Sequence, residues 1–394
     1  MKPLTGLIFT LLLTTTASAG EINFVKGMTW KQIKSKAARE NKMIFFDAYA
    51  SWCGPCKYLE KNIYTDDKVA SYYNTYFINV KLDMEQGEGV QLSKEFEITA
   101  YPTLLFFSPD GKMVHKYVGA LEALPFINLG KDARDPEKQY FRLKENARNN
   151  TLPDADFSNW ASAADKMNDP DKDPLIQTYL NAKADILGNK DIANTLFKYT
   201  DYYTVTQLSY LYAHQTKAGQ LMEWDEERTA AVLYKKLFTQ ALMVYESSNH
   251  NIDSFSNYIK QICAEKAKYA TRELLIREAA VTEKDTEKTT RLLIAGLEDM
   301  QNPVGIEAIA GWLLNYAAAF EKENYQQITN RLTNFQLRPL DKDKEYWLWL
   351  MQMFCYIKVG DSEKAKSFAE KGYRHPLLPL DYKDVLKEKY GFTD

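Results

Sequence analysis

The stretch FDAYASWCGPCK, residues 46–57, joins an apolar segment to two cysteines that flank a Gly-Pro pair. Residues 43–49 are apolar and aromatic, which predicts a buried strand that ends just before the cysteines. A helix is expected to follow over residues 56–63. Pro55 suits the first turn of a helix, because its fixed φ fits there and its missing N–H is not needed.

The position of Cys53 before this helix has a chemical consequence. The free N–H donors and the positive end of the helix dipole at such a position both favour the thiolate. Cys56 follows about one turn later. This spacing lets Cys53 attack a disulfide and lets Cys56 resolve the mixed disulfide. The pattern therefore predicts a working redox couple.

Two other readings of the cysteine pair are possible. A CxxC pair is half of many zinc sites, which need a second pair of ligands. The chain has no second CxxC, and its histidines stand apart from one another: His115, His214, His250 and His375. No metal site is therefore predicted. A permanent structural disulfide is disfavoured, because closing a two-residue loop constrains the unfolded chain little.

The first 19 residues have the features of a secretory signal peptide. Lys2 precedes an apolar run over residues 7–13, and residues 17–19 fit an Ala-x-Ala cleavage site. The run is too short to span a bilayer, which needs about 20 residues. We expect a secreted chain that does not span the membrane after cleavage, periplasmic in a Gram-negative cell. An uncleaved N-terminal anchor is the alternative.

Composition limits the partners and cofactors. The 394 residues carry a formal net charge of −3 and no basic cluster, which gives no electrostatic case for binding nucleic acid. No Gly-x-Gly-x-x-Gly follows a predicted strand, so no dinucleotide site is expected. The predicted redox chemistry then needs no cofactor beyond the Cys53–Cys56 dithiol, but it needs a separate electron donor, which we expect to be a membrane thiol reductant.

Residues 20–134 alternate helical and strand-like segments, which predicts an α/β domain. Thr29 and Gln32 form a capping-box pattern for a helix that ends near Glu40. Pro109-Asp110-Gly111 predicts a hairpin turn. The other expected elements are strands over residues 77–82, 103–107 and 112–118 and a helix over residues 90–96.

Residues 135–394 predict an all-helical domain, because apolar residues recur there at three-to-four spacing. Three junctions, in residues 184–199, 318–332 and 355–372, share a helix–turn–helix pattern weakly similar to tetratricopeptide repeats. We expect an irregular array of helical hairpins, with an ordinary helical bundle as the alternative. The expected helices cover residues 175–187, 192–203, 229–245, 254–277, 286–300, 306–321 and 346–359.

The two remaining cysteines, Cys263 and Cys355, lie in these predicted helices. Both fall on apolar helical stripes, so we expect buried free thiols there, with a bond between the two as the alternative.

Residues 27–133 resemble the thioredoxin family. Four stretches carry the resemblance: FDAYASWCGPCK, VKLD, YPTLLFF and VGAL. The spacing CK-x-x-E-K-x-x-Y-x-D-x-x-V, residues 56–69, looks most like the periplasmic thioredoxin-like domain of transmembrane disulfide reductants.

The resemblance implies a role for the acid and the lysine near the cysteines. Asp47 would be a buried acid of raised pKa that accepts the proton of Cys56 through water, and Lys81 would moderate that shift. The alternatives are a surface-facing strand end for Asp47 and a solvated strand residue for Lys81.

The resemblance also implies a substrate surface. A cis peptide before Pro102 would expose the backbone of Tyr101 for pairing with an extended substrate. Trp52 would form a flat apolar wall, and Gly54 and Pro55 would lie at the contact. The alternative for Tyr101 is ordinary core packing.

Together these features favour a secreted thiol–disulfide oxidoreductase that reduces protein disulfides. Gly54-Pro55 with Asp47 resembles the reducing members of the family. The alternatives are a disulfide isomerase or oxidase, or a redox-sensitive adaptor whose helical domain holds a partner. We expect that domain to select or position substrates.

Overall fold

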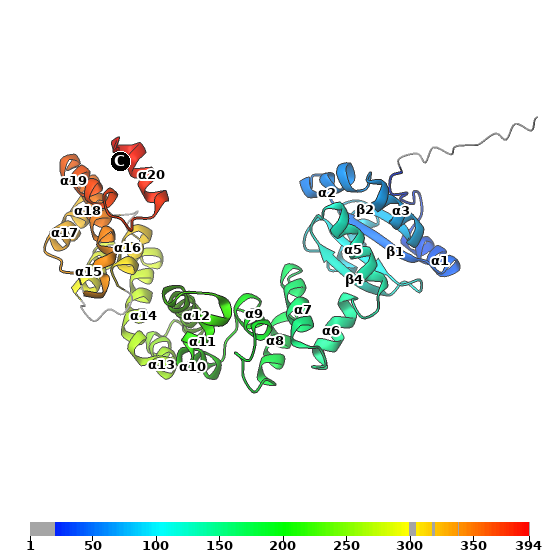
Figure 1. Cartoon of the computed structure of the whole chain (residues 1–394), viewed down its shortest axis with the longest axis horizontal. Helices are drawn as coiled ribbons and strands as arrows, with labels where there is room; N and C mark the ends of the chain where they lie inside the picture. The colour runs from blue at the N-terminus through cyan, green and yellow to red at the C-terminus, as the bar shows by residue number, and fades with distance from the viewer. Residues whose placement is uncertain (1–19, 299–304, 317–319, 338, 394) are drawn as a thin grey trace, which may run out of the picture. The chain divides into compact units, whose positions relative to one another are not determined.

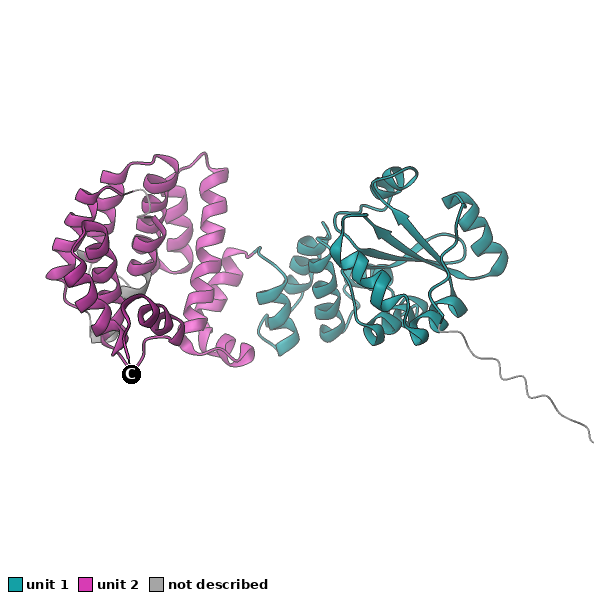
Figure 2. Cartoon of the chain, turned by 90° about the horizontal axis from the view of Figure 1, so that it is seen from above, with its two compact units in different colours: residues 1–202 teal, residues 203–394 magenta. Residues whose placement is uncertain are grey.

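The computed structural model describes residues 20–298, 305–316, 320–337 and 339–393. The predicted signal peptide, residues 1–19, lies outside the described residues and stays a prediction. The chain divides into two compact units, the first ending at Tyr202 and the second beginning at Tyr203 (Figure 2).

A four-stranded sheet forms the centre of the first unit (Figure 1). Its order is β2-β1-β3-β4, with β1 parallel to β2 and antiparallel to β3, and β3 antiparallel to β4. The strands are β1 (Met43–Tyr49), β2 (Phe77–Asp83), β3 (Thr103–Phe107) and β4 (Met113–Val118). All four expected strands are present, and the α/β fold class is confirmed.

Helices cover both faces of this sheet. Alternate residues of β1 point to opposite sides. Phe45 packs with Tyr73 and Phe126 in one core cluster, while Phe46 packs with Trp30 and Leu92 in the other. The helices are α1 (Trp30–Glu40), α2 (Gly54–Tyr58), α3 (Asp67–Tyr76), α4 (Gly89–Glu95) and α5 (Ala123–Arg134).

The capping box predicted at the start of α1 is confirmed, since both of its reciprocal hydrogen bonds are present. The helix after the cysteines differs from the prediction. It begins at Gly54, two residues early, and continues beyond Tyr58 as a π-helix over Leu59–Ile63. Helices α3 and α5 were not among the expected elements.

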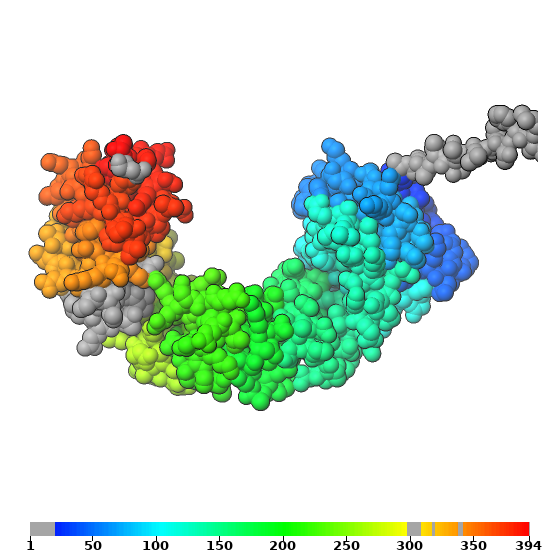
Figure 3. Space-filling model, viewed as in Figure 1, coloured from blue at the N-terminus to red at the C-terminus, as the bar shows by residue number. Residues whose placement is uncertain are grey.

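Four more helices complete the first unit: α6 (Tyr140–Arg148), α7 (Asp154–Lys166), α8 (Lys172–Asn181) and α9 (Lys190–Lys198). Helix α6 packs on the edge strand β4, and the space-filling view shows this helical segment directly against the sheet domain (Figure 3). The backbone N–H of Tyr140 donates to Nδ1 of the buried His115, at 3.0 Å. The domain border expected at residue 134 therefore lies inside the first compact unit. That residues 20–134 form a separate, independently folding domain stays a prediction.

The described part of the second unit is helical, as the fold class predicts. Helix α18 packs between α17 and α19, its neighbours in the chain, but a regular repeat stays a prediction. The α-helices are α10 (Val205–Ala213), α11 (Gln215–Met222), α12 (Glu226–Ser247), α13 (Ile252–Ile262), α14 (Ala264–Arg277), α15 (Thr286–Glu298), α16 (Gly305–Tyr316), α17 (Lys322–Thr333), α18 (Glu345–Val359), α19 (Ser362–Tyr373) and α20 (Leu380–Tyr390).

The other two cysteines, Cys263 and Cys355, are free and buried, as predicted. Their settings differ from each other. Cys355 lies within α18, whereas Cys263 lies between α13 and α14 with an extended φ of −153°. The single helix expected over residues 254–277 is therefore wrong, because the chain leaves the helical conformation at Cys263. Among the described residues, no helix is both long and apolar enough to cross a membrane.

Candidate active site at the Cys53–Cys56 pair

The two cysteines meet where the chain leaves β1 and enters α2. Cys53 is the N-cap residue of α2, and its Sγ accepts a hydrogen bond from the backbone N–H of Cys56 at 3.1 Å. Pro55 lies in the first turn, as expected. The two sulfur atoms are joined in a disulfide, and both side chains are buried. The structure therefore represents the oxidised form of the predicted couple.

An exposed edge lies beside this buried disulfide. Tyr101 packs against the small buried cluster that contains both cysteines, and its ring centroid lies 5.9 Å from that of Trp52. Trp52 is 66% exposed, and its Nε1–H donates to the Glu85 carboxylate at 3.0 Å. The indole thus has a fixed orientation and a free face, which suits contact with a polypeptide.

The proline loop has the expected backbone conformation. The peptide bond between Tyr101 and Pro102 is cis. The carbonyl of Pro102 accepts a hydrogen bond from the N–H of Gly119 at 2.9 Å, so the end of β4 lies next to this loop. Gly54 is exposed, like Pro55, while Pro102 is buried. All five predicted substrate-contact residues therefore lie in this region, although their roles stay predictions.

Asp47, on β1, is fully buried, which excludes the surface-facing strand end. Within the described structure, neither oxygen of its carboxyl group has a hydrogen-bond partner, and nor does the nearby Tyr64 hydroxyl. Burial raises the pKa of Asp47 to about 7. The neighbouring Tyr64 hydroxyl opposes this shift as a polar group that favours the carboxylate, although it is outside hydrogen-bond geometry with it. The Lys81 ammonium also opposes the shift, while Glu60 adds to it. Such a group changes charge near neutral pH, as a general base must.

Lys81 lies opposite Asp47 in the parallel register of β1 and β2. Its ammonium nevertheless pairs with the Glu60 carboxylate, at 2.8 Å, and lies 4.6 Å from the ring centroid of Tyr49. The Lys81 side chain is only 13% exposed, so it is not a solvated strand residue. Lys81 therefore acts on Asp47 at longer range while neutralising a second acid.

Three residues at the site, Glu60, Tyr64 and Glu85, were not predicted from the sequence. A signal for Glu60 was available, because it lies four residues after Cys56 on the same helical segment. Tyr64 and Glu85 have no comparable signal, because the fold alone brings them to the site. Among the described residues, no group of three or more His, Cys, Asp or Glu side chains could hold a metal ion.

Comparison with known proteins places this site in a family. Residues 28–134 match the family of the thioredoxin-like domain. The thiol:disulfide interchange protein DsbD of Yersinia pestis is 31% identical over 110 residues, which make up 27% of this chain and 18% of DsbD. The chain thus spans under a fifth of that relative's length.

Two other similar proteins are covered almost completely. A solved structure, a putative disulphide-isomerase from Bacteroides thetaiotaomicron, is 40% identical with a TM-score of 0.28, over 30% of this chain and 98% of its own. The thioredoxin of Mycoplasmoides gallisepticum is 36% identical over 98 residues, which are 24% of this chain and 88% of that thioredoxin. Through its N-terminal residues, this chain belongs to the thioredoxin family.

Proposed function

We propose that this chain is a thiol–disulfide oxidoreductase that reduces protein disulfides outside the cytoplasm. The observation that carries the proposal is the Cys53–Cys56 disulfide at the start of α2, beside the cis-proline loop and the exposed Trp52. The features of residues 1–19 support a secreted location, periplasmic in a Gram-negative cell.

The reduced form starts the reaction. The Cys53 thiolate attacks one sulfur of the substrate disulfide, forming a mixed disulfide and releasing the other substrate sulfur as a thiolate. The helix start favours the thiolate of Cys53, and the backbone of Tyr101 next to the cis-proline can pair with an extended substrate segment. Trp52 supplies an apolar contact next to the reacting sulfur.

The second step releases the product. Asp47, with its pKa near neutrality, takes the proton of the Cys56 thiol through water. The Cys56 thiolate then attacks Cys53, which forms the Cys53–Cys56 disulfide and frees the second substrate thiolate. Two electrons pass from the dithiol to the substrate. A separate membrane thiol reductant restores the dithiol by the same exchange, so no bound cofactor is required.

Cysteine variants test the proposal. Cys53→Ser should abolish reduction of a generic protein disulfide, whereas Cys56→Ser should accumulate mixed disulfides through Cys53 that appear on non-reducing gels. Cys355→Ser, which removes a buried free thiol, is the matched control and should leave turnover unchanged. Trapping by the Cys53→Ser variant would reverse the assignment. Full turnover by both active-site variants would refute the proposed chemistry.

A further inference from the structure

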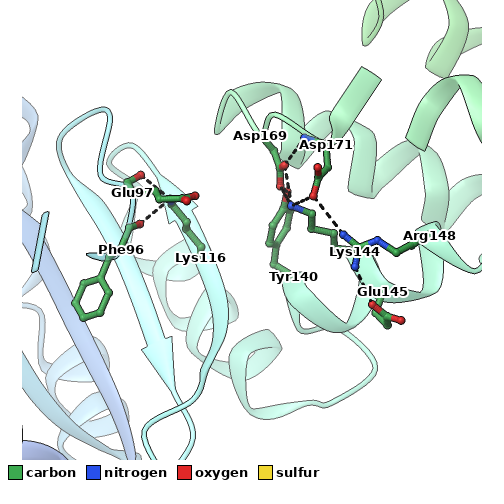
Figure 4. Close-up of polar contacts among 9 residues, drawn as sticks. All are labelled: Phe96, Glu97, Lys116, Tyr140, Lys144, Glu145, Arg148, Asp169 and Asp171. Atoms are coloured by element: carbon green, nitrogen blue, oxygen red, sulfur yellow. Dashed lines mark hydrogen bonds and ion pairs between the residues drawn. The ribbon is translucent and has the colours of Figure 1, made fainter. Parts of the chain in front are cut away.

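A cleft of about 430 Å³ lies within the first unit, where the sheet domain faces the helices that follow it. Residues 95–97 and 99 and Lys116 of β4 form one wall. Tyr140 and Lys144 of α6, with residues 167–171 before α8, form the other (Figure 4). Phe141 and Met113 add apolar surface. The cleft therefore has polar walls and partly apolar lining.

The cleft adjoins the cis-proline loop. Thr99 lines it and lies two residues before Tyr101. On the other side, Val118 pairs with Thr103, the residue after Pro102. From Val118 to Lys116 the strand advances two residues, about 7 Å at the usual rise. An extended chain bound along the loop therefore reaches the cleft within a few residues.

A second hollow connects the same surfaces. It has a volume of about 130 Å³ and lies between residues 116–118 of β4 and the C-terminal half of α7. Lys116 and Met167 line both hollows. The surface beside the cis-proline loop is thus continuous with the space between β4 and the helices.

The charges in the cleft favour a cationic occupant. Four carboxylates line it, against two ammonium groups. Lys144 is already paired with Asp169 and Asp171, at 2.8 and 2.9 Å. The Lys116 ammonium contacts the backbone carbonyls of Phe96 and Glu97, at 3.3 and 3.1 Å (Figure 4).

The carboxylates of Glu95 and Glu97 remain available. Both side chains are exposed, and neither forms a hydrogen bond or an ion pair within the described residues. Burial lowers the pKa of the Lys116 ammonium, and the nearby Glu97 carboxylate opposes this shift, so this lysine partly compensates Glu97 but not Glu95. An acidic or phosphorylated partner would meet the Glu95 and Glu97 carboxylates and is disfavoured. Asp169 and Asp171, in contrast, are already paired with basic side chains. A lysine or arginine side chain would pair with the carboxylates and pack its aliphatic stem on Phe141 and Met113.

We propose that this cleft is a substrate subsite, which holds the polypeptide flanking the attacked cysteine and prefers a basic side chain there. The inference rests on the proposed function. It gives helix α6 and the loop between α7 and α8 a direct part in substrate selection, because they supply one wall of the subsite.

The test uses the full chain and short peptides whose single cysteine is joined to thionitrobenzoate. Lysine, glutamine or glutamate occupies each of the four positions on either side of that cysteine. With lysine at one or two positions, KM should be about fivefold lower than with glutamine, while kcat stays the same. Raising the salt from about 0.1 to about 1 M should remove the difference, because the screening length falls from about 10 to about 3 Å.

The double variant Glu95→Gln, Glu97→Gln should lose this preference, so that its KM for the lysine peptides equals its KM for the glutamine peptides. Glu21→Gln removes an exposed carboxylate outside the cleft and should keep the preference. Equal KM values at every position, or a preference that persists in the double variant, would overturn the subsite.

Failure of the subsite and failure of the proposed function are distinguishable. If the wild-type chain does not reduce even a generic disulfide, the proposed function fails. The subsite is then decided by the Kd of fluorescent peptides in which serine replaces cysteine. A fivefold preference for lysine over glutamine supports it, and equal Kd values refute it.

Discussion

Replacing Asp47 by asparagine should change the way stability depends on pH. The carboxyl group is fully buried without a hydrogen-bond partner in the described structure, and burial raises its pKa from 3.8 to about 7. The folded state therefore prefers the protonated acid. This contribution to stability is complete below pH 3.8 and is lost as the pH rises towards 7.

The size of the effect follows from the shift. One pKa unit corresponds to about 1.4 kcal/mol, so the rise from 3.8 to about 7 costs the folded wild type about 4 kcal/mol at pH 8 relative to pH 3. Asp47→Asn removes the titration. Its buried amide adds a cost of about 1–3 kcal/mol that does not depend on pH. The pH dependence of the difference in unfolding free energy between the variant and the wild type therefore reports the Asp47 carboxyl group alone.

Native-state hydrogen exchange of the oxidised full chain measures this difference. Peptides from β1 and β3 should be read between pH 4 and 8, with intrinsic exchange corrected at each pH. From pH 4 to pH 8, the unfolding free energy of the variant should rise by about 4 kcal/mol relative to that of the wild type. Asp156→Asn, which changes an exposed aspartate of the same unit, is the control and should give a flat difference. A flat difference for Asp47→Asn would show that the acid is ionised throughout and would remove the reason for its role as a base.

Three further outcomes are expected. Near neutral pH, Asp47→Ala should slow the resolution of the mixed disulfide by Cys56 at least tenfold more than it slows the first attack by Cys53, because the base acts only in the second step. Stopped-flow fluorescence separates the two steps. Equal slowing of both would indicate a structural role for Asp47. Lys81→Met should raise the pH midpoint of resolution, because the ammonium lowers the pKa of Asp47; an unchanged midpoint in a pH–rate profile would show that the two groups do not interact. Burial lowers the pKa of His115 from 6.5 to about 4, so the folded state favours the neutral imidazole. The unfolding free energy should therefore include this stabilisation in full above pH 6.5 and lose about 3 kcal/mol as the pH falls to 4. Hydrogen exchange of the α6 amides measures this loss, and His115→Gln should abolish it.

The strands of the N-terminal domain could be predicted because their signal is local. β1 and β3 are short apolar runs bounded by turn or loop residues, and the structure reproduces their predicted limits. Helix α3 was missed although Asp66 caps its first turn and Val69, Ala70 and Tyr73 form its buried face. Its apolar residues continue directly into β2, so the change of period within the run is hard to locate.

The π-helix after α2 has a different origin. The N–H of Tyr64 donates to the carbonyl of Leu59, five residues back, at 2.9 Å. Side-chain periodicity over so few residues does not distinguish this pattern from an α-helix. The helix limits after the cysteines were therefore the least predictable part of the active-site segment.

Within the site, the motif placed the cysteines and the proline loop correctly, but it could not assign the ion pair of Lys81. Two acids compete for the ammonium, and the sequence does not show which one is accessible to it. Asp47 is enclosed in the core, while Glu60 is 64% exposed on the helix and can meet a flexible side chain. Burial depends on the tertiary packing around β1, so this pairing could be found only from the fold.

The cleft beside the proline loop was beyond prediction for a related reason. Its walls come from four separate stretches of the chain, and two of these lie after the domain border expected at residue 134. In the sequence, His115 is only an isolated histidine without a second metal ligand nearby. In the fold, its Nδ1 accepts the N–H of Tyr140 and fixes the start of α6 against β4. The helices that pack on β4 across the expected domain border at residue 134 also form one wall of the subsite. A chain truncated after residue 134 would therefore lack that wall even if its redox chemistry were intact.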